Sequence, residues 1–351
     1  MGELDVATLL RRHSELEAEF GDGDDGNFLS GWQCANPWAD TIEQLVAQER
    51  ESLSAASYQS LDLDELLERR LAEFHRDVDC VAPEAFFCTG GGTALLFTIC
   101  SWLRQRDITS VIYLPPLYFT VHFALRLLGI RGRAVSGRQA FDDGFTMNLP
   151  QTSSVLFLSD PVWYAGIPIE RDVIDRIACW QRETKSLVVV DGSFQYMQWD
   201  GIAAEATVRL DPALTLRVIC PTKRLAIHGY RFAYATVPKA LRTELVQLYA
   251  RIYGSDSTET VAFARLALNY RTTSKIVSNI TGLCSERHLD LRRRGAIEAA
   301  WEPRCGYFIF ERILAPLPPE LILMDGAYFE QLRHTDHRRI NLLSPSIGLL
   351  N

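Results

Sequence analysis

The chain has 351 residues, of which 47% are hydrophobic and 23% are charged, and these proportions exclude a disordered, collagen-like or coiled-coil protein. The formal net charge of −8 argues against a general role in binding nucleic acid, which needs a basic surface, but it permits one local anion site. The longest apolar runs, such as residues 155–158 and 187–190, are too short to span a membrane, and residues 1–18 do not fit a signal peptide, so we expect a cytoplasmic protein.

Residues 1–55 have a polar, helical pattern with an irregular patch at residues 27–38. From residue 84, short apolar runs alternate with amphipathic helical patterns at residues 93–104, 118–128 and 169–183. The runs occupy residues 84–88, 110–114, 133–136, 153–158, 186–190, 216–220 and 231–237. Nearly unbroken apolar runs are typical of strands buried on both faces. Their alternation with helices predicts an α/β fold, with a mostly parallel seven-stranded sheet flanked by helices.

The C-terminal residues 256–351 begin with a long helical pattern and then offer a few short strands, at residues 307–311 and 321–324. We therefore expect the N-terminal segment, residues 1–55, to join residues 256–351 in a smaller α+β domain. The large domain would then comprise residues 56–255. Ligand sites tend to lie at the seam between two domains, so a cleft there is the expected place for a site.

A glycine-rich loop, TGGGT at residues 89–93, follows the first predicted strand and opens a predicted helix. Glycines let backbone amides approach an anion, and the helix N-terminus adds a partial positive charge. The loop matches neither a Walker A motif nor a GxGxxG fingerprint. An ordinary tight turn would use the same residues, so the loop alone leaves both interpretations open.

Two further polar motifs follow predicted strands. Asp191 comes directly after the apolar run 187–190, where a carboxylate is costly unless it is paired. It would either cap the next helix or pair with a protonated heterocyclic nitrogen. Lys223 follows the run 216–220, and Arg231 lies eight residues further on. An amine kept from water suits Schiff-base chemistry, and the arginine could bind an anion bidentately, although either side chain alone could simply be a solvated surface residue.

Together, in this order, the three motifs resemble those of the class I and II aminotransferases, fold type I enzymes that use pyridoxal 5′-phosphate. The family pattern around its lysine is S-x-[ST]-K followed by G-x-R-x-G. This chain has CPTK at residues 220–223 and GYRFA at residues 229–233. The resemblance extends over roughly residues 30–345 and is strongest from residue 84 to residue 237.

The resemblance implies a role for each matching residue around the cofactor. Lys223 would form a Schiff base with it and later carry a proton, and Asp191 would keep its pyridinium nitrogen protonated. Tyr118, in PPLY at residues 115–118, matches the aromatic residue that covers the ring. The phosphate would be held by Gly91, Gly92, Thr93, Thr222 and Arg231.

Two matches lie outside these motifs. Tyr58 resembles the tyrosine that reaches the phosphate of the neighbouring subunit, which implies a homodimer with shared sites. Arg339, in RRINL at residues 338–342, matches the arginine that binds the α-carboxylate of the substrate. Arg338, the residue next to it, is the alternative for that role, and two solvated side chains would explain the same pair.

The chain departs from the family at the ring hydroxyl. Trp163 falls on the second Asn of the family pattern N-P-x-N-P, and Phe194 falls on the Tyr of D-x-[AG]-Y. Trp163 and Phe194 would lie beside the cofactor, but they would not supply the two hydrogen bonds that the family's Asn and Tyr make to the ring hydroxyl. Tyr164, Gln195 or Tyr196 could replace them.

The resemblance therefore implies an enzyme that transfers the α-amino group of an amino acid to a 2-oxo acid. The departures keep open a pyridoxal-phosphate enzyme of the same fold that catalyses elimination, replacement, cyclisation or oxidation in specialised biosynthesis. A non-catalytic protein that acts through binding alone is a third possibility. The eight cysteines and seven histidines include no CxxC pair and no HExxH, so we expect buried reduced thiols and no metal site.

Overall fold

The computed structural model describes residues 8, 11, 12, 14, 15, 28–298, 300–319, 321–330 and 333–350. Much of the expected N-terminal segment, namely residues 1–7, 9, 10, 13 and 16–27, lies outside the described residues. From residue 28 onward the description is nearly continuous, so it covers every predicted motif.

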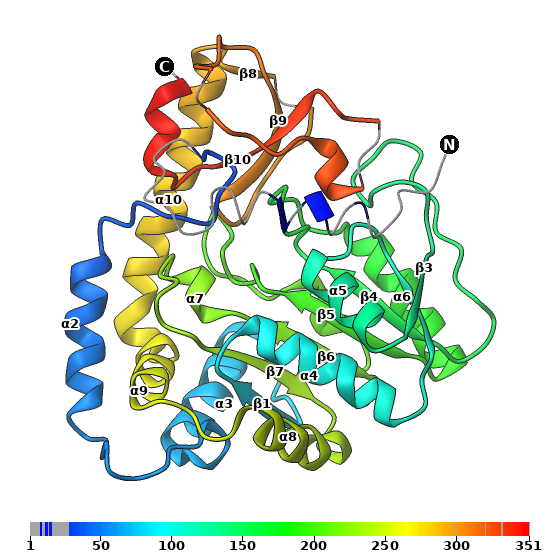
Figure 1. The fold of residues 1–351 in the computed structure, drawn as a ribbon, viewed down its shortest axis with the longest axis vertical. Coiled ribbons are helices and arrows are strands. Elements are labelled where there is room, and N and C mark those ends of the chain that lie inside the picture. Colours follow the sequence, from blue (N-terminus) through cyan, green and yellow to red (C-terminus); the bar gives the residue numbers. More distant parts are fainter. Residues whose placement is uncertain are drawn as a thin grey trace.

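A seven-stranded sheet in the order β1-β7-β6-β5-β4-β2-β3 forms the centre of the molecule (Figure 1). Its strands are β1 (Ala85–Thr89), β2 (Ser110–Tyr113), β3 (Arg131–Ala134), β4 (Val155–Ser159), β5 (Leu187–Gly192), β6 (Thr215–Ile219) and β7 (Ala233–Val237). Strand β7 runs antiparallel to β1 and β6, whereas the pairs from β6 to β3 are parallel. The predicted fold class is therefore confirmed.

One strand differs from its expected environment. The sequence pattern predicts that the run 133–136 is buried on both faces, but β3 starts two residues earlier and is exposed along its whole length. It lies at the edge of the sheet and pairs only with β2. The arginines at positions 131 and 133 alternate around Gly132, and charged side chains suit an edge that must not pair with another chain.

Helices cover both faces of the sheet because successive strand residues point to opposite sides. On one face, Phe157 and Val189 pack with α4 and α5; on the other, Leu156 and Val188 pack with α6. The helices are α2 (Ala39–Arg50), α3 (Glu65–Asp79), α4 (Gly92–Gln105), α5 (Phe119–Leu127), α6 (Arg171–Thr184), α7 (Pro221–Arg224), α8 (Lys239–Tyr253), α9 (Thr258–Ala267) and α10 (Tyr270–Arg293).

Segments from both ends of the chain meet around a second, antiparallel sheet. Its order is β10-β9-β8, with β8 (Ile297–Glu298), β9 (Phe308–Ile313) and β10 (His337–Asn341). The segment at residues 28–38 lies against it, since the Asn341 amide donates to the Leu29 carbonyl at 2.9 Å and the Asn341 side chain donates to the Gly31 carbonyl at 3.0 Å. The long helix α10 runs from α9 up to this small sheet (Figure 1).

The strand expected at residues 321–324 is absent from the described sheets, and the sequence pattern does not predict β10, the strand that carries Arg339. Ile322 makes only an isolated bridge with Phe28. Met324 then binds two different partners, because its amide donates to the Ser30 hydroxyl at 2.8 Å and its carbonyl accepts from the Arg339 amide at 3.0 Å. Residues 321–324 therefore bond to residues 28–30 and to β10 without forming a strand of their own.

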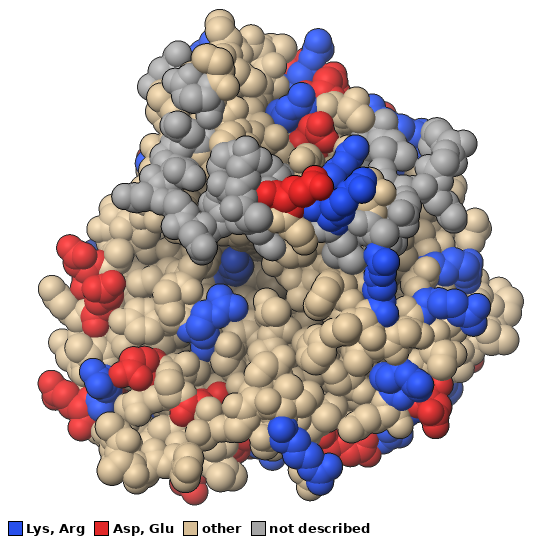
Figure 2. Space-filling view, in the orientation of Figure 1, with Lys and Arg blue, Asp and Glu red and all other residues tan. Residues whose placement is uncertain are grey.

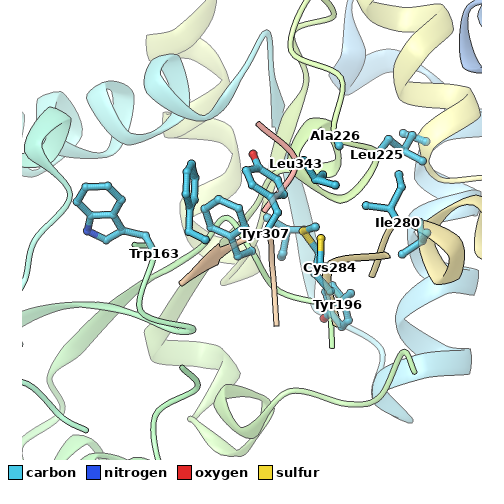
Figure 3. Packing of buried hydrophobic residues seen from close by; sticks show 14 of the residues in the cluster. Trp163, Tyr196, Leu225, Ala226, Ile280, Cys284, Tyr307 and Leu343 are labelled. Carbon is cyan, nitrogen blue, oxygen red and sulfur yellow. The ribbon is translucent and has the colours of Figure 1, made fainter. Parts of the chain in front are cut away.

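A large buried cluster joins the small sheet to the rest of the molecule. In Figure 3, Trp163 stands at one end of this cluster and Ile280 of α10 at the other, with Tyr307 and Leu343 between them in this view. None of the described helices combines the length and the hydropathy that crossing a membrane requires.

Candidate active site

A cavity of about 300 Å³ lies at the edge of the large sheet where β1, β4, β5 and β6 end. The space-filling view shows a hollow near the middle of this face of the molecule, with basic side chains beside it (Figure 2). Carboxyl ends of parallel strands commonly form ligand sites. The predicted residues that line the cavity are Gly92, Thr93, Tyr118, Trp163, Asp191, Phe194, Thr222, Lys223 and Arg231.

One end of the cavity is built to accept an anion. Gly91, at φ +120°, precedes α4, and a Cβ there would lie 3.0 Å from Arg231 Nη2. A Cβ on Gly92 would lie 2.7 Å from Cys220 Sγ. Both positions therefore need glycine, and the close backbone leaves the amide groups of the helix N-terminus beside the guanidinium. Such a combination of amides, helix dipole and arginine binds phosphate groups.

Hydrogen bonds hold this glycine loop from behind. The Gly90 amide donates to the Tyr249 hydroxyl at 2.8 Å, and that hydroxyl donates to Asp256 Oδ1 at 2.9 Å. The Asp256 amide donates to the Gln59 carbonyl at 3.1 Å. Tyr58 is the residue before Gln59, and 96% of its surface is exposed. It does not line the cavity of its own chain.

Asp191 is the penultimate residue of the central strand β5 and carries a buried carboxylate. Burial raises its pKa, whereas hydrogen bonds from Ser193 and the charge of Lys223 lower it. The Ser193 hydroxyl and amide both donate to Oδ1, at 2.5 and 3.2 Å. No hydrogen bond to Oδ2 from the described residues accompanies them. A cation-bearing ligand in the cavity would therefore stabilise this carboxylate.

Lys223 lies on the short helix α7, directly after β6. Burial lowers its pKa to about 8, and the nearby cations of Arg231 and Arg339 act in the same direction. Its Nζ lies 3.8 Å from the centre of the Trp32 ring. A lysine with this pKa is partly neutral at physiological pH, which makes it a nucleophile and a proton carrier.

Aromatic side chains form the remaining walls. Tyr118 meets Trp163 edge-on, with ring centroids 5.1 Å apart, and Phe194 meets Tyr307 at 5.1 Å. The Trp163 indole nitrogen is buried and has no hydrogen-bond partner among the described residues. Of the three residues proposed from the sequence to replace the missing hydroxyl partners, two bind elsewhere, since Gln195 donates to Thr207 and the Tyr196 hydroxyl donates to Asp79. The third, Tyr164, meets Trp163 edge-on with ring centroids 5.5 Å apart.

The C-terminal region fixes the turn that leads into Tyr118. Glu330 Oε1 accepts from the Leu117 amide at 3.3 Å and lies 2.8 Å from His122 Nε2, while Glu330 Oε2 accepts from the Tyr113 hydroxyl at 3.2 Å. Tyr118 is the N-cap residue of α5. Its ring meets that of Trp32 edge-on, with centroids 6.2 Å apart.

Arg339 lies on β10, where only 1% of its surface is exposed. One nitrogen, Nη2, donates to the Ser30 carbonyl and to Met324 Sδ, whereas Nε and Nη1 have no partner among the described residues. Burial lowers its pKa to about 9. It does not line the cavity, because the aromatic rings of Trp32 and Trp163 lie against it, 4.9 and 5.5 Å from its guanidinium carbon.

Several cavity residues were not predicted from the sequence. The additional lining residues are Trp32, Leu96, Phe119, Ser193, Cys220 and His228. His228 lies between the lysine and arginine motifs, so its place in the chain could have identified it. Trp32 belongs to the irregular patch at residues 27–38, which contains no motif that indicates a site.

A sequence model of the family described as aminotransferase class I and II matches residues 29–273. No curated protein sequence matches the chain significantly.

Solved structures of similar shape cover almost the whole chain. A probable N-succinyldiaminopimelate aminotransferase from Thermus thermophilus has a TM-score of 0.74 and 16% identity, with 99% of this chain and 97% of that chain covered. N-Succinyldiaminopimelate aminotransferase from Mycobacterium tuberculosis has a TM-score of 0.76 and 15% identity, covering 97% and 96%. Aspartate aminotransferase from Rhizobium meliloti has a TM-score of 0.75 and 16% identity, covering 100% and 96%. At these identities the likeness shows the fold and not the substrate.

Proposed function

The chain belongs to the family of class I and II aminotransferases, and we propose that its cavity binds pyridoxal 5′-phosphate and transfers the α-amino group of an amino acid to a 2-oxo acid. The family assignment confirms the prediction of an aminotransferase-type enzyme. The observation that carries the proposal is one cavity that gathers an anion cradle, a buried carboxylate and an amine of lowered pKa.

The residues present fit the cofactor. The cradle formed by Gly91, Gly92 and Arg231 suits its phosphate, because it combines the N-terminus of α4 with a guanidinium. Asp191 suits its pyridine nitrogen, because a buried carboxylate with one oxygen held by Ser193 is stabilised by a cationic partner. When bound, pyridoxal phosphate supplies an electrophilic aldehyde and an electron sink, and the protein supplies orientation and electrostatics.

Lys223 would act both as the amine that attaches the cofactor and as the group that moves the substrate α-proton. With a pKa of about 8, its Nζ can accept a proton and return it near neutral pH. Arg339 would hold the α-carboxylate, because two of its nitrogens lack partners among the described residues and a guanidinium binds a carboxylate bidentately. Tyr58 would complete the phosphate site of a second subunit, which makes the active form a homodimer.

Product analysis tests the reaction type. The purified protein would be incubated with single amino acids, with and without an added 2-oxo acid, and the amines and oxo acids would be separated by chromatography. We expect a new amino acid to form only when an acceptor is present, and the Lys223→Ala variant to form none. Release of ammonia or of an unsaturated product without an acceptor would contradict transamination and favour elimination or oxidation.

A further inference from the structure

The indole of Trp32 lies against both Lys223 and Arg339. Trp32 lines the cavity together with Lys223, whereas Arg339 does not. The Trp32 ring centre is 3.8 Å from Lys223 Nζ and 4.9 Å from the Arg339 guanidinium carbon. An α-amino acid carries its nitrogen and its carboxylate on one carbon, so it must present these groups to both cations at once. The indole therefore contacts the two groups that a substrate must reach.

Aromatic rings surround the Arg339 guanidinium. Besides Trp32, the rings of Trp163, Phe308 and Phe329 lie 5.5, 4.5 and 5.4 Å from the Arg339 guanidinium carbon. Trp32 and Trp163 are almost parallel, with ring planes 15° apart and centroids separated by 6.2 Å. Ring faces stabilise a cation, but they supply no acceptor for Nε and Nη1. A carboxylate would satisfy both nitrogens, so it would compete with the indole for this guanidinium.

The segment that carries Trp32 is anchored on each side of it. Ser30 donates to the Arg339 carbonyl through its hydroxyl at 2.5 Å, and the Asn341 side chain donates to the Gln33 carbonyl at 2.8 Å. Trp32 itself is only partly buried and meets Phe308 edge-on at 5.0 Å. Its backbone is therefore held in place while its side chain borders the cavity, so a movement of the ring would be a side-chain rotation.

We propose that Trp32 gates the carboxylate site, so that a substrate carboxylate reaches Arg339 by displacing the indole. The inference rests on the proposed function, since it takes Arg339 as the carboxylate ligand. It adds a residue that sets the affinity for the substrate. A site whose open form is only a fraction of the population binds its ligand more weakly by that fraction. Removing the indole should therefore tighten binding.

Calorimetric titration with propionate tests the gate. Propionate carries the carboxylate without an amine, and propionamide is its uncharged counterpart. We expect Trp32→Ala to bind propionate about tenfold more tightly than the unaltered protein, because the closed form is lost. Trp32→Phe, which keeps a ring, should bind propionate with nearly the affinity of the unaltered protein. Propionamide should bind neither to the unaltered protein nor to Trp32→Ala. Unchanged or weaker binding of propionate by Trp32→Ala would overturn the gate.

Two further variants fix the location and the cause. Trp38→Ala removes an indole from the same segment at a position that does not line the cavity, so it should leave propionate binding unchanged; equal tightening there would show a loosened segment instead. Trp32→Ala combined with Arg339→Gln should lose the tightened binding, and retention of it would place the carboxylate elsewhere. Uptake of pyridoxal phosphate is followed separately by absorbance. Its failure would contradict the proposed function, whereas the titration reports on the gate alone.

Discussion

At Lys223 and Asp191, burial moves two pKa values in opposite directions. It lowers the pKa of the lysine to about 8 and raises that of the aspartate. Both shifts arise because a poorly solvated site disfavours charge, whatever its sign. The lysine thereby becomes an available nucleophile, and the carboxylate is left in need of a cation. The lysine therefore suits an electrophilic group, and the aspartate suits a cationic group, of the same ligand.

The lysine shift predicts how cofactor attachment depends on pH. Only the neutral amine attacks an aldehyde, and the neutral fraction rises as pH increases through the pKa. We expect the rate of pyridoxal phosphate attachment to rise through a midpoint near pH 8, set by Lys223, and to level off above it. Stopped-flow absorbance between about pH 6 and pH 11.5 measures this rate, a range that includes the ordinary lysine pKa of roughly 10.4. A midpoint at that ordinary value would show that the amine is solvated.

Replacing Asp191 tests the need for a carboxylate. Asp191→Asn keeps the shape but removes the charge that would pair with the pyridine nitrogen. Loss of one partner of a buried pair costs about 3–5 kcal/mol, so we expect the affinity for pyridoxal phosphate to fall by two orders of magnitude or more. Equilibrium dialysis measures it. The control is Asp175→Asn at an exposed ion pair with Arg209, which should bind normally; an equal loss in both variants would point to a general defect.

At the scale of elements, the start of α4 and the end of β6 are packed so closely that they accept no extra atom. A Cβ on Gly92 would lie 2.7 Å from Cys220 Sγ. Cys220 stands where the family has serine, and Ser193 lies 3.3 Å from its sulfur. The contact therefore joins the anion cradle at Gly91 and Gly92 to Asp191, the carboxylate that would face the ring. The effect on stability of a substitution at the start of α4 should therefore depend on the residue that follows β6.

A double-mutant cycle measures this coupling. Gly92→Ala forces a shift and should lower the free energy of unfolding by about 1–3 kcal/mol, the usual cost of overpacking. Cys220→Ala in the same chain removes the sulfur and should recover most of that loss. Chemical denaturation measures each variant. Gly137→Ala, where a Cβ meets nothing within 4 Å, is the control. Equal losses with and without Cys220 would show that the two elements are not coupled here.

The strand ends also explain how much of the site could be predicted. The glycine loop, Asp191 and Lys223 each follow a strand, and parallel strands bring their carboxyl ends to one edge, so their meeting follows from the local pattern. The surroundings of Arg339 do not. They combine Trp32, Trp163 and Phe308 from distant parts of the chain, and β10, with the sequence HRRIN, lacks the apolar alternation typical of a strand. Such contacts depend on tertiary packing, for which no local signal exists.

At the scale of the whole molecule, Tyr58 lies outside the cavity of its own chain. Its surface is 96% exposed, and it stands beside Gln59, whose carbonyl accepts from Asp256. Asp256 in turn supports Tyr249 and the glycine loop. An exposed tyrosine next to the structure that holds the phosphate cradle is well placed to reach a second copy of the chain. The proposed homodimer therefore predicts that each active site uses residues of two chains, which a monomer could not provide.

Hybrid dimers of two defective chains test whether the sites are shared. Tyr58→Ala should fold normally, because exposed residues contribute little to stability, but should bind pyridoxal phosphate about tenfold or more weakly, because a hydrogen bond to a charged group is worth roughly 1.5–3 kcal/mol. Lys223→Ala should not attach the cofactor at all. In a hybrid of the two, the intact Lys223 of one chain receives the intact Tyr58 of the other, so one complete site forms per dimer. We therefore expect tight covalent attachment at half of the sites, measured by borohydride trapping and intact mass after the two chains are refolded together. If Tyr58 instead acts within its own chain, the chain with Lys223 still lacks its tyrosine, and the hybrid binds no better than Tyr58→Ala alone.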